Sequence, residues 1–288
     1  MKPDNVRCQL EQCPQRPIVV ASHRRSGTHL MIDLLRRHMV ECRGWKYPGE
    51  ALNRLYLMLE SLYEPHAAIP TTEAKALAIL QRCDRPLVKT HLEPENLALT
   101  SETGLNELGA YWMNWLKQRA TWLYSYRDGR VVMCSLHMFR MCHDASARVS
   151  LSEFMRQEHG GLSRPKVWAR HVRKWLAVPN VVPLKFEDMV SDAHVTLDHI
   201  ARSMGLTFQP KQPLLPHLKQ RWRIRLDRMI ARRPSSTAVR GRYKGRSPQK
   251  WHKAFSPQDR RFFHDEAGDL LIELGYETSD AWVTSSKG

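Results

Sequence analysis

The sequence predicts an α/β protein in which a central, mostly parallel sheet is flanked by helices. Short apolar runs of strand length recur along the chain, at residues 18–21, 87–90, 121–126 and 181–186. Segments with helical spacing of apolar residues stand between these runs, and no repeat or long glycine, serine or proline linker interrupts the order. Strands that alternate with helices favour a parallel sheet covered on both faces.

The helical segments follow the strands in a regular order. After the first strand, residues 22–27 are polar and turn-like, and apolar residues at helical spacing begin from Thr28. A helix over residues 129–139 follows the third strand, whereas residues 45–82 are predicted to be irregular and helical. Three later helices are marked by apolar residues at 167–176, 197–204 and 262–274, the last two closed by Gly205 and Gly275.

Length and composition predict a soluble protein with one domain. The 288 residues are enough for one large α/β domain, and 42% of them are apolar. No apolar run approaches the ~20 residues that span a membrane, and residues 1–5 lack the apolar run of a secretory signal. We therefore expect a cytoplasmic protein with a flexible N-terminal segment, residues 1–16, and one domain over residues 17–288.

The chain is strongly basic, with a formal net charge of +16 from 45 Lys and Arg against 29 Asp and Glu. Such a charge attracts nucleic acid, an anionic membrane or a phosphate-rich small molecule, and a merely basic soluble surface also fits. The six cysteines show no CxxC spacing and no His or Cys cluster near them, so we expect reduced thiols and no metal site. They are Cys8, Cys13, Cys42, Cys83, Cys134 and Cys142.

The segment between the first strand and its helix has the character of an anion-binding loop. It reads Ser22-His23-Arg24-Arg25-Ser26-Gly27-Thr28-His29. Free backbone N–H groups at the start of a helix, together with the helix dipole, hold phosphate or sulfate. Gly27 lets the backbone approach the anion, Arg25 adds a fixed cation and Thr28 adds a hydroxyl. The Walker A pattern GxxxxGK[ST] is absent, and the string alone fits a turn with solvated arginines equally well.

Two further strand ends carry residues suited to anion chemistry. Lys89 and His91 lie two residues apart at the end of the second strand, and the period of two points them to the same side. A neutral histidine beside a lysine suits proton abstraction next to an anionic leaving group. Arg127 ends the third strand and Ser135 follows eight residues later, an arrangement suited to a second phosphate. Each pair alone also fits a structural histidine or a local ion pair.

An arginine-dense segment runs from Arg221 to Arg246. It ends in the string Arg240-Gly241-Arg242-Tyr243-Lys244-Gly245-Arg246. Glycine with arginine and lysine can form a loop that wraps a polyanion. By itself the segment also fits a solvated basic surface or a nucleic-acid patch.

In this order and spacing, the strings resemble the PAPS-dependent cytosolic sulfotransferases, where PAPS is 3′-phosphoadenosine 5′-phosphosulfate. The family's TYPKSGTTW loop is matched by residues 22–30, and its KTHLP by Lys89-Thr90-His91-Leu92, with Glu93 in place of proline. Its Arg…Ser pair is matched by Arg127 and Ser135. Three further strings, WxxHVxxW, YED and RKGxxGDWKxxF, are matched by residues 168–175, 186–188 and, loosely, 244–255. The resemblance covers residues 17–276.

The resemblance implies a single P-loop-like domain that transfers the sulfuryl group of PAPS in line, without a metal, to a hydroxyl or amine of a small-molecule acceptor. His91 would be the general base, and Lys89 and Arg25 would be catalytic cations. The cofactor-binding residues would be Arg24, Arg25, Ser26, Gly27, Thr28, His29, Arg127, Ser135, Arg242, Lys244 and Gly245. Neither nucleic acid nor a membrane is an expected partner.

The chain departs from the family pattern at several positions. Leu30 stands where the family has an adenine-stacking tryptophan, and Phe186 where a tyrosine hydroxyl reaches adenine. In the family's RKGxxGDWKxxF string, Lys244 aligns with the arginine when Trp251 is aligned with the tryptophan. Lys244 aligns with the lysine of that string when the glycines are aligned instead. The family's dimer motif KxxxTVxxxE falls on residues 252–261 and is not kept, so the sequence leaves the oligomeric state open.

Two other functions remain as alternatives. A small-molecule kinase that uses ATP would need Mg²⁺ ligands, and the sequence offers neither a Walker A motif nor a clear set of metal carboxylates. A basic nucleic-acid-binding protein would explain the charge but not the Lys89/His91 pair, and no nucleic-acid fold signature is present. The acceptor is not readable, because its candidate lining mixes His, Arg and Glu with aromatic residues; this lining comprises residues 45–62, 137–141 and 150–165.

Overall fold

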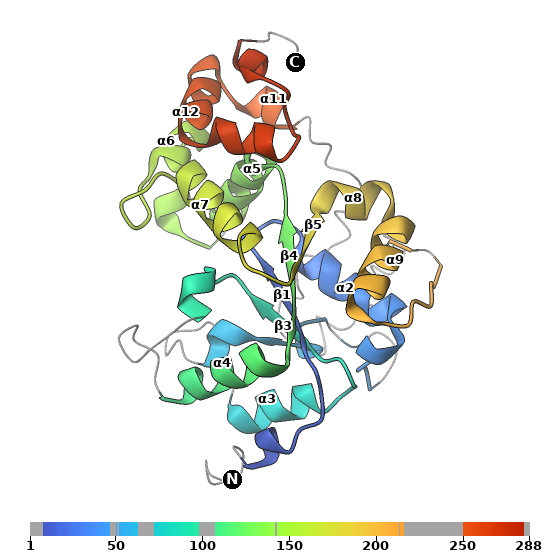
Figure 1. The fold of residues 1–288 in the computed structure, drawn as a ribbon. Coiled ribbons are helices and arrows are strands. Elements are labelled where there is room, and N and C mark those ends of the chain that lie inside the picture. Colours follow the sequence, from blue (N-terminus) through green and yellow to red (C-terminus); the bar gives the residue numbers. More distant parts are fainter. Residues whose placement is uncertain are drawn as a thin grey trace.

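The computed structural model describes residues 8–46, 50, 52–62, 72–97, 107–141, 143–212, 214–215 and 250–284. Within these ranges the strands form one sheet in the order β2-β3-β1-β4-β5 (Figure 1). The strands are β1 (Ile18–Ser22), β2 (Tyr56–Met58), β3 (Leu87–Thr90), β4 (Thr121–Tyr126) and β5 (Val181–Lys185). Every neighbouring pair is parallel. The predicted fold class, a parallel sheet flanked by helices, is therefore confirmed.

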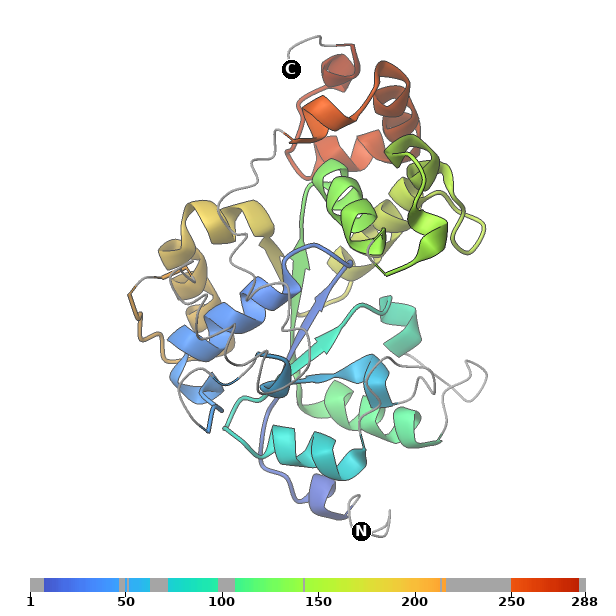
Figure 2. The ribbon, with the colours of Figure 1, turned by 180° about the vertical axis from the view of Figure 1, so that it is seen from behind.

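Helices connect the strands and pack on both sides of the sheet (Figure 2). The α-helices of the described ranges are α2 (Thr28–His38), α3 (Glu73–Leu80), α4 (Glu107–Arg119), α5 (Gly129–Arg140), α6 (Leu151–Arg156), α7 (Arg164–Leu176), α8 (Phe186–Ser191), α9 (Ala193–Met204), α11 (Lys250–Ala254) and α12 (Pro257–Glu273). Short 3₁₀ turns include η3 (Leu59–Leu62), η4 (Pro94–Leu97) and η9 (Asp280–Val283). The helices expected from apolar spacing correspond to α2, α5, α7, α9 and α12.

Strand β1 lies at the centre of the sheet and divides the core into two layers. Val19 and Ala21 pack in the layer formed with α3, α4, α5 and α7, whereas Ile18 and Val20 pack in the layer under α2 and α9. This alternation is the period of two of a strand. Figure 1 shows α2, α8 and α9 on one side of the sheet and α3, α4 and α7 on the other. Because helices cover both faces, every residue of β1 is buried.

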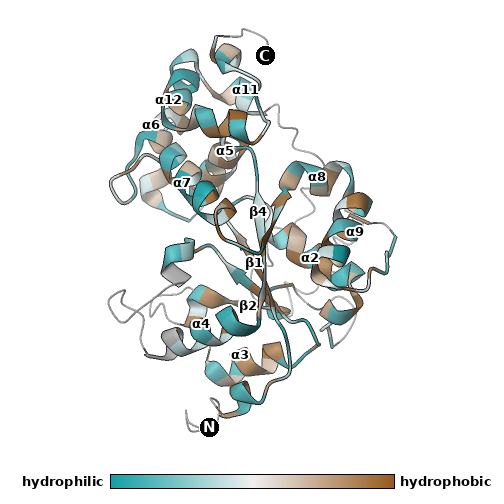
Figure 3. Ribbon diagram, viewed as in Figure 1, coloured by the Kyte–Doolittle hydropathy of each residue, from teal (hydrophilic) through white to brown (hydrophobic). Residues whose placement is uncertain are grey.

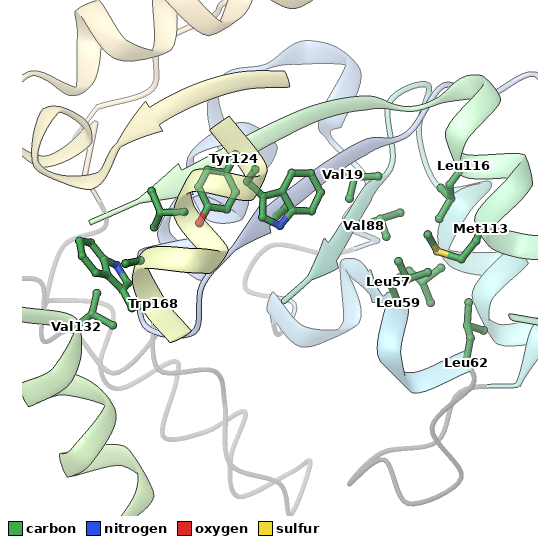
Figure 4. Packing of buried hydrophobic residues seen from close by; sticks show 14 of the residues in the cluster. Val19, Leu57, Leu59, Leu62, Val88, Met113, Leu116, Tyr124, Val132 and Trp168 are labelled. Atoms are coloured by element: carbon green, nitrogen blue, oxygen red, sulfur yellow. The ribbon is translucent and has the colours of Figure 1, made fainter. Parts of the chain in front are cut away.

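The first layer joins the strands to the helices below them. Figure 4 shows Val19, Val88 and Tyr124, from three adjacent strands, between Met113 and Leu116 of α4 on one side and Trp168 of α7 on the other, and all belong to one buried cluster. Hydrophobic colour in Figure 3 is correspondingly concentrated along the strands and the inner sides of the helices, with hydrophilic colour outside. The sheet is thus packed closely against its helices, and the loops that follow start from its carboxyl edge.

The start of α5 is anchored by close packing and by a buried arginine. A Cβ at Gly129 would lie 2.6 Å from the ring of Trp168, so glycine is needed for α5 to approach α7. Arg130, which is 2% exposed, pairs with Glu277 and stacks 3.9 Å from the centroid of the Trp251 ring. The C-terminal helices are therefore fixed to the same helix that follows β4.

Two local assignments differ from the sequence expectation. Residues 45–82 contain a strand, β2, besides the expected helix and irregular turns. It is a three-residue edge strand that pairs with β3 on one side, too short to show a periodicity. The last strand ends at Lys185, one residue early, because Phe186 begins α8.

The carboxyl ends of β1, β3 and β4 meet at one edge of the sheet. The register pairs Ala21 with Thr90 and Ser22 with Ser125. Ligands of open parallel sheets bind outside such an edge. The loop after β1, the residues after β3 and the end of β4 therefore come together at this edge.

Candidate active site

The loop after β1 presents an uncapped helix N-terminus. Gly27 is the N-cap of α2, with φ of 102°, and neither a capping side chain nor an acidic residue of the first turn approaches the free N–H groups. A Cβ at Gly27 would lie 2.4 Å from the Phe186 ring, so a larger residue does not fit. The Ser26 hydroxyl is buried and has no hydrogen-bond partner among the described residues. Such a helix start is well suited to hold an anion.

Arg25 extends from this loop towards α5. Its backbone lies in the left-handed region with φ of 74°, which is uncommon outside glycine. Its Nε donates to the Ser135 hydroxyl at 3.1 Å, and its guanidinium lies 5.1 Å from the centroid of the Phe139 ring. Two predicted site residues that are 110 positions apart thus touch. The side chain of Arg24, in contrast, is exposed.

Arg127 joins Arg25 at one end of the loop. Its Nη1 donates to the carbonyl oxygen of Arg25 at 3.4 Å, and its guanidinium stacks 4.1 Å from the centroid of the Phe186 ring. Its Nε lies 4.0 Å from a carboxylate oxygen of Glu187. Burial raises the pKa of Glu187, whose other oxygen accepts a hydrogen bond from the Tyr276 hydroxyl. Phe186, which stands at the position of the family's tyrosine, therefore supports both Gly27 and this arginine.

Lys89 lies in β3 with only 7% of its surface exposed. Its Nζ is 3.3 Å from Nε2 of His29, and the Tyr56 hydroxyl is 3.0 Å from the same nitrogen. An ammonium group only donates, so the contact requires His29 to be unprotonated at Nε2. Burial holds the pKa of His29 well below its usual range, in agreement with this. Burial also lowers the pKa of Lys89 to about 8.

His91 follows β3, and its ring is oriented by β1. Its Nδ1 lies 2.8 Å from the carbonyl oxygen of Ser22. A carbonyl only accepts, so Nδ1 carries the proton and Nε2 carries the lone pair. Burial and the nearby charge of Lys89 hold the pKa of His91 well below its usual range. At neutral pH the side chain is therefore a neutral imidazole with its lone pair on Nε2, the state that a general base requires, in a residue that is partly exposed.

Helix α7 holds the main chain around His91. His171 Nε2 donates to the His91 carbonyl oxygen at 3.2 Å, and the Tyr124 hydroxyl donates to His171 Nδ1 at 2.9 Å. Trp175 Nε1 donates to the carbonyl oxygen of Leu92 at 2.9 Å. Burial lowers the pKa of His171 to about 4, so it remains neutral in this arrangement. The WxxHVxxW helix thus supports the turn that carries His91.

Most of the predicted site comes together at this edge, and the rest falls on residues that the structure does not describe. Arg242, Lys244 and Gly245 are outside the described residues. Leu30 is fully buried in the layer under α2 and α9, so it belongs to the core. Glu60, which accepts a hydrogen bond from the backbone of His91, was not expected from the sequence. It lies in the segment without a recognised motif, and no spacing in the sequence marks it.

The described residues also bear on metals, membranes and thiols. Among them, no group of three or more His, Cys, Asp or Glu side chains is arranged to hold a metal ion. No helix in the same ranges is both long and apolar enough to cross a membrane. The described cysteines are all free thiols: Cys8, Cys13, Cys42, Cys83 and Cys134.

Acidification is expected to destabilise the protein steeply below about pH 6.5. Six histidines in the described ranges have lowered pKa values, mainly because of burial: His23 (about 3), His29, His38, His91, His171 (about 4) and His252. The folded protein keeps them neutral, whereas the unfolded chain protonates them. Each therefore contributes stability that is present above pH ~6.5 and is lost, at roughly 1 kcal/mol per pH unit, as the pH falls towards the folded pKa.

Urea unfolding at about pH 7.5, 6 and 5 measures this loss. His171→Gln should reduce the slope of unfolding free energy against pH by the contribution of one proton. His199→Gln, at an exposed position of α9, should leave the slope unchanged. Equal free energies of unfolding at the two ends of this pH range would show that these histidines are already protonated in the folded protein.

Comparisons with known proteins agree with this fold. Residues 15–275 match the family model described as the sulfotransferase domain, whereas no curated protein matches the sequence. Among solved structures, the chain is similar to retinol dehydratase in complex with androsterone and the inactive cofactor PAP, with 17% identity, a TM-score of 0.59, and coverage of 91% of this chain and 83% of that one. It is also similar to mouse sulfotransferase SULT7A1 complexed with PAP, with 15% identity, a TM-score of 0.52, and coverage of 98% and 93%.

These structural similarities, at such low identity, concern the fold. The family model, in contrast, spans most of the chain and includes the loop after β1, the end of β3 and the end of β4. The chain therefore belongs to the sulfotransferase family of enzymes.

Proposed function

We propose that this protein transfers the sulfuryl group of PAPS to a hydroxyl or amine of a small-molecule acceptor, with His91 as the general base. The observation that carries the proposal is the neutral imidazole of His91, oriented by the Ser22 carbonyl and placed near the buried ammonium of Lys89. A base and a cation at one place suit removal of the acceptor's proton while negative charge develops on the leaving group.

The loop after β1 fits the phosphosulfate end of PAPS. The buried Ser26 hydroxyl has unused hydrogen-bonding capacity, and the N–H groups at the start of α2 have no capping side chain. When bound, PAPS supplies a sulfuryl group attached to a phosphate oxygen that leaves as an anion. Residues 26–29 would hold that phosphate through their backbone. The similar structures that contain PAP support this choice of donor.

Arginine side chains would bind the other end of the nucleotide. Arg127 and Ser135 lie on the Arg25 side of the loop and would hold the 3′-phosphate. In our proposal Arg242, Lys244 and Gly245 complete this site. Charge-assisted hydrogen bonds to phosphate are among the strongest in proteins, which suits a ligand that must be distinguished from ATP.

Lys89 and Arg25 would stabilise the charge that develops during transfer. Arginine keeps its proton at every pH at which proteins are folded, so Arg25 can serve only as a fixed charge. Lys89, with a pKa of about 8, is mostly protonated at neutral pH. His91 takes the acceptor's proton on Nε2, and the acceptor oxygen or nitrogen forms the bond to sulfur as the bond to the phosphate oxygen breaks.

Ligand-dependent stabilisation tests the proposal against a kinase and a nucleic-acid-binding protein. PAP should raise the Tm by several degrees at saturating concentration, whereas Mg²⁺–ATP and a short oligonucleotide should raise it far less. Labelled PAPS incubated with a panel of hydroxyl and amine acceptors should then give a labelled product. Stronger stabilisation by ATP or by the oligonucleotide, without PAPS turnover, would favour the corresponding alternative.

Arg127→Ala should identify the 3′-phosphate site in the same assay. We expect PAP to bind roughly 10–100-fold more weakly, because a charged hydrogen bond contributes about 1.5–3 kcal/mol. AMP, which lacks the 3′-phosphate, should lose little. Arg202→Ala removes the same charge from an exposed position of α9 and serves as the control. Equal losses for PAP and AMP would place Arg127 away from the 3′-phosphate.

A further inference from the structure

Glu60 is a buried carboxylate next to the proposed active site. It lies in η3, directly after the edge strand β2, and only 2% of its surface is exposed. Taking a carboxyl group out of water is unfavourable unless hydrogen bonds or an opposite charge compensate for it. Burial accordingly raises its pKa, and Lys89 and the hydrogen bonds from the 90–91 segment oppose that rise. The contacts of Glu60 must therefore compensate for the cost of its burial.

One oxygen of Glu60 fixes the turn that leaves β3. Oε1 accepts the backbone N–H of His91 at 2.5 Å and the hydroxyl of Thr90 at 3.2 Å. The Thr90 hydroxyl in turn accepts the N–H of Leu92 at 3.1 Å. A single carboxylate oxygen thus orders three consecutive residues, and the middle one carries the proposed base.

These contacts complete a frame around His91. Glu60 holds its N–H, His171 holds its carbonyl oxygen, and the Ser22 carbonyl holds its ring at Nδ1. The direction of Nε2 depends on all three bonds, because the ring rotates about a Cα that the first two hold. A proton transfer is sensitive to displacements smaller than the length of one such bond.

The other oxygen of Glu60 is buried and has no hydrogen-bond partner among the described residues. The carboxylate raises the pKa of Lys89, against the larger effect of burial. The remaining groups that face Lys89 are basic or neutral: Arg24 and Arg25 of the loop, His29 of α2, Tyr56 of β2 and His91. In the described part of the chain, Glu60 is thus the acidic group that offsets the arginines around this ammonium.

We propose that Glu60 is a positioning residue for sulfuryl transfer: its Oε1 holds the His91 amide so that Nε2 faces the acceptor, and its buried carboxylate offsets the positive groups around Lys89. The proposal rests on the proposed function of this site. Glu60 does not touch the reacting atoms; it acts through the base on one side and through the cation on the other.

Two substitutions separate these effects. Glu60→Gln keeps an oxygen that can accept the His91 N–H but removes the charge. With an aliphatic alcohol acceptor, kcat near pH 6.5 should then stay within about fivefold of wild type, and the alkaline limb of the pH profile should move to lower pH, because Lys89 loses its proton more readily. Glu60→Ala removes both oxygens, and kcat should fall by about 10-fold or more while the Kd of PAP and the KM of the acceptor change little.

Glu50→Gln is the matched control, because Glu50 is another buried carboxylate, paired with Arg82. It should lower the Tm without moving the pH profile. Tm measurements on all variants separate loss of folding from loss of activity, and Glu60→Gln tests the proposal even when Glu60→Ala does not fold. The proposal would be overturned if both Glu60 variants had the kcat of wild type and the same alkaline limb of the pH profile.

A titration that needs no turnover separates this proposal from the proposed function. The Lys89 ammonium can be followed by NMR of the ¹³Cε-labelled lysines in the ligand-free protein, with Lys89→Arg to assign the signal. Its pKa should be lower in Glu60→Gln than in wild type. A lowered Lys89 pKa in a protein that does not turn over PAPS would remove the proposed function and leave the control of Lys89 by Glu60 standing. An unchanged pKa in an active enzyme would remove that control alone.

Discussion

His91→Ala is expected to lower kcat by about 10²–10⁴-fold, the usual contribution of a positioned general base. The binding of PAP should remain close to that of wild type, because in the proposed mechanism the imidazole acts only on the acceptor's proton and the loop after β1 would hold the nucleotide. The Ser22 carbonyl fixes the tautomer with the proton on Nδ1, so the substitution removes Nε2, the nitrogen that would accept the proton. Single-turnover rates and the Kd of PAP, measured on the same preparation, check both statements.

The pH profile of the wild type gives an independent check on this base. Burial and the charge of Lys89 hold the pKa of His91 well below its usual range, so the acidic limb of kcat should lie below pH ~6.5. His143→Ala changes an exposed histidine and should leave both the rate and the profile unaltered. Turnover of His91→Ala within a few-fold of wild type would show that another group removes the proton.

Arg25→Met is expected to lower kcat by about 10²–10³-fold, the range seen when one group that stabilises developing charge is removed. Arg25→Lys should keep substantial activity, because a cation remains near the leaving oxygen even though the planar fork is lost. Both substitutions keep a side chain at a backbone with φ of 74°, so their cost in folding should be similar. The difference between their kcat values therefore reports the charge.

Arg24→Met is the matched comparison for Arg25→Met. The Arg24 side chain is exposed, whereas Arg25 contacts Ser135 and Phe139, so we expect Arg24→Met to keep most of its activity. If Arg24→Met loses its kcat while Arg25→Met stays near wild type, Arg24 rather than Arg25 is the cation that stabilises the developing charge. If Arg25→Lys is as inactive as Arg25→Met, the site requires the fork geometry of arginine rather than a charge alone.

The sequence was sufficient for four of the five described strands and for the loop after β1. Apolar runs marked β1, β3, β4 and β5 because a strand buried on both faces needs apolar side chains in sequence. Gly27 marked the loop because its positive φ and its contact with the Phe186 ring leave no space for a Cβ. Strand β2 escaped prediction because three residues at the edge of a sheet carry no period. Requirements of this kind are local, so the residue type at the constrained position reveals them.

The chemistry of the site, in contrast, depends on partners that are distant in the chain. His91 is a candidate base by its place after β3, but its tautomer is set by Ser22, which is 69 positions away. Its amide is held by Glu60, 31 positions away, and its carbonyl by His171, 80 positions away. Nothing in the segment around Glu60 marks a carboxylate that will be buried, because a buried charge is tolerated only where the folded chain provides its partners.

By itself the sequence determined four of the described strands, the helices marked by apolar spacing, the loop after β1 and which side chains are chemically able to move a proton or hold a charge. Only the tertiary structure decided the protonation states of those residues and the direction in which they act. The physical reason is that a pKa and a hydrogen bond depend on distance and solvent. Lys89 has a pKa of about 8 because the sheet buries it, and His29 meets it from a helix 60 positions away. Residue type fixes what a group can do, and packing fixes what it does at a given pH.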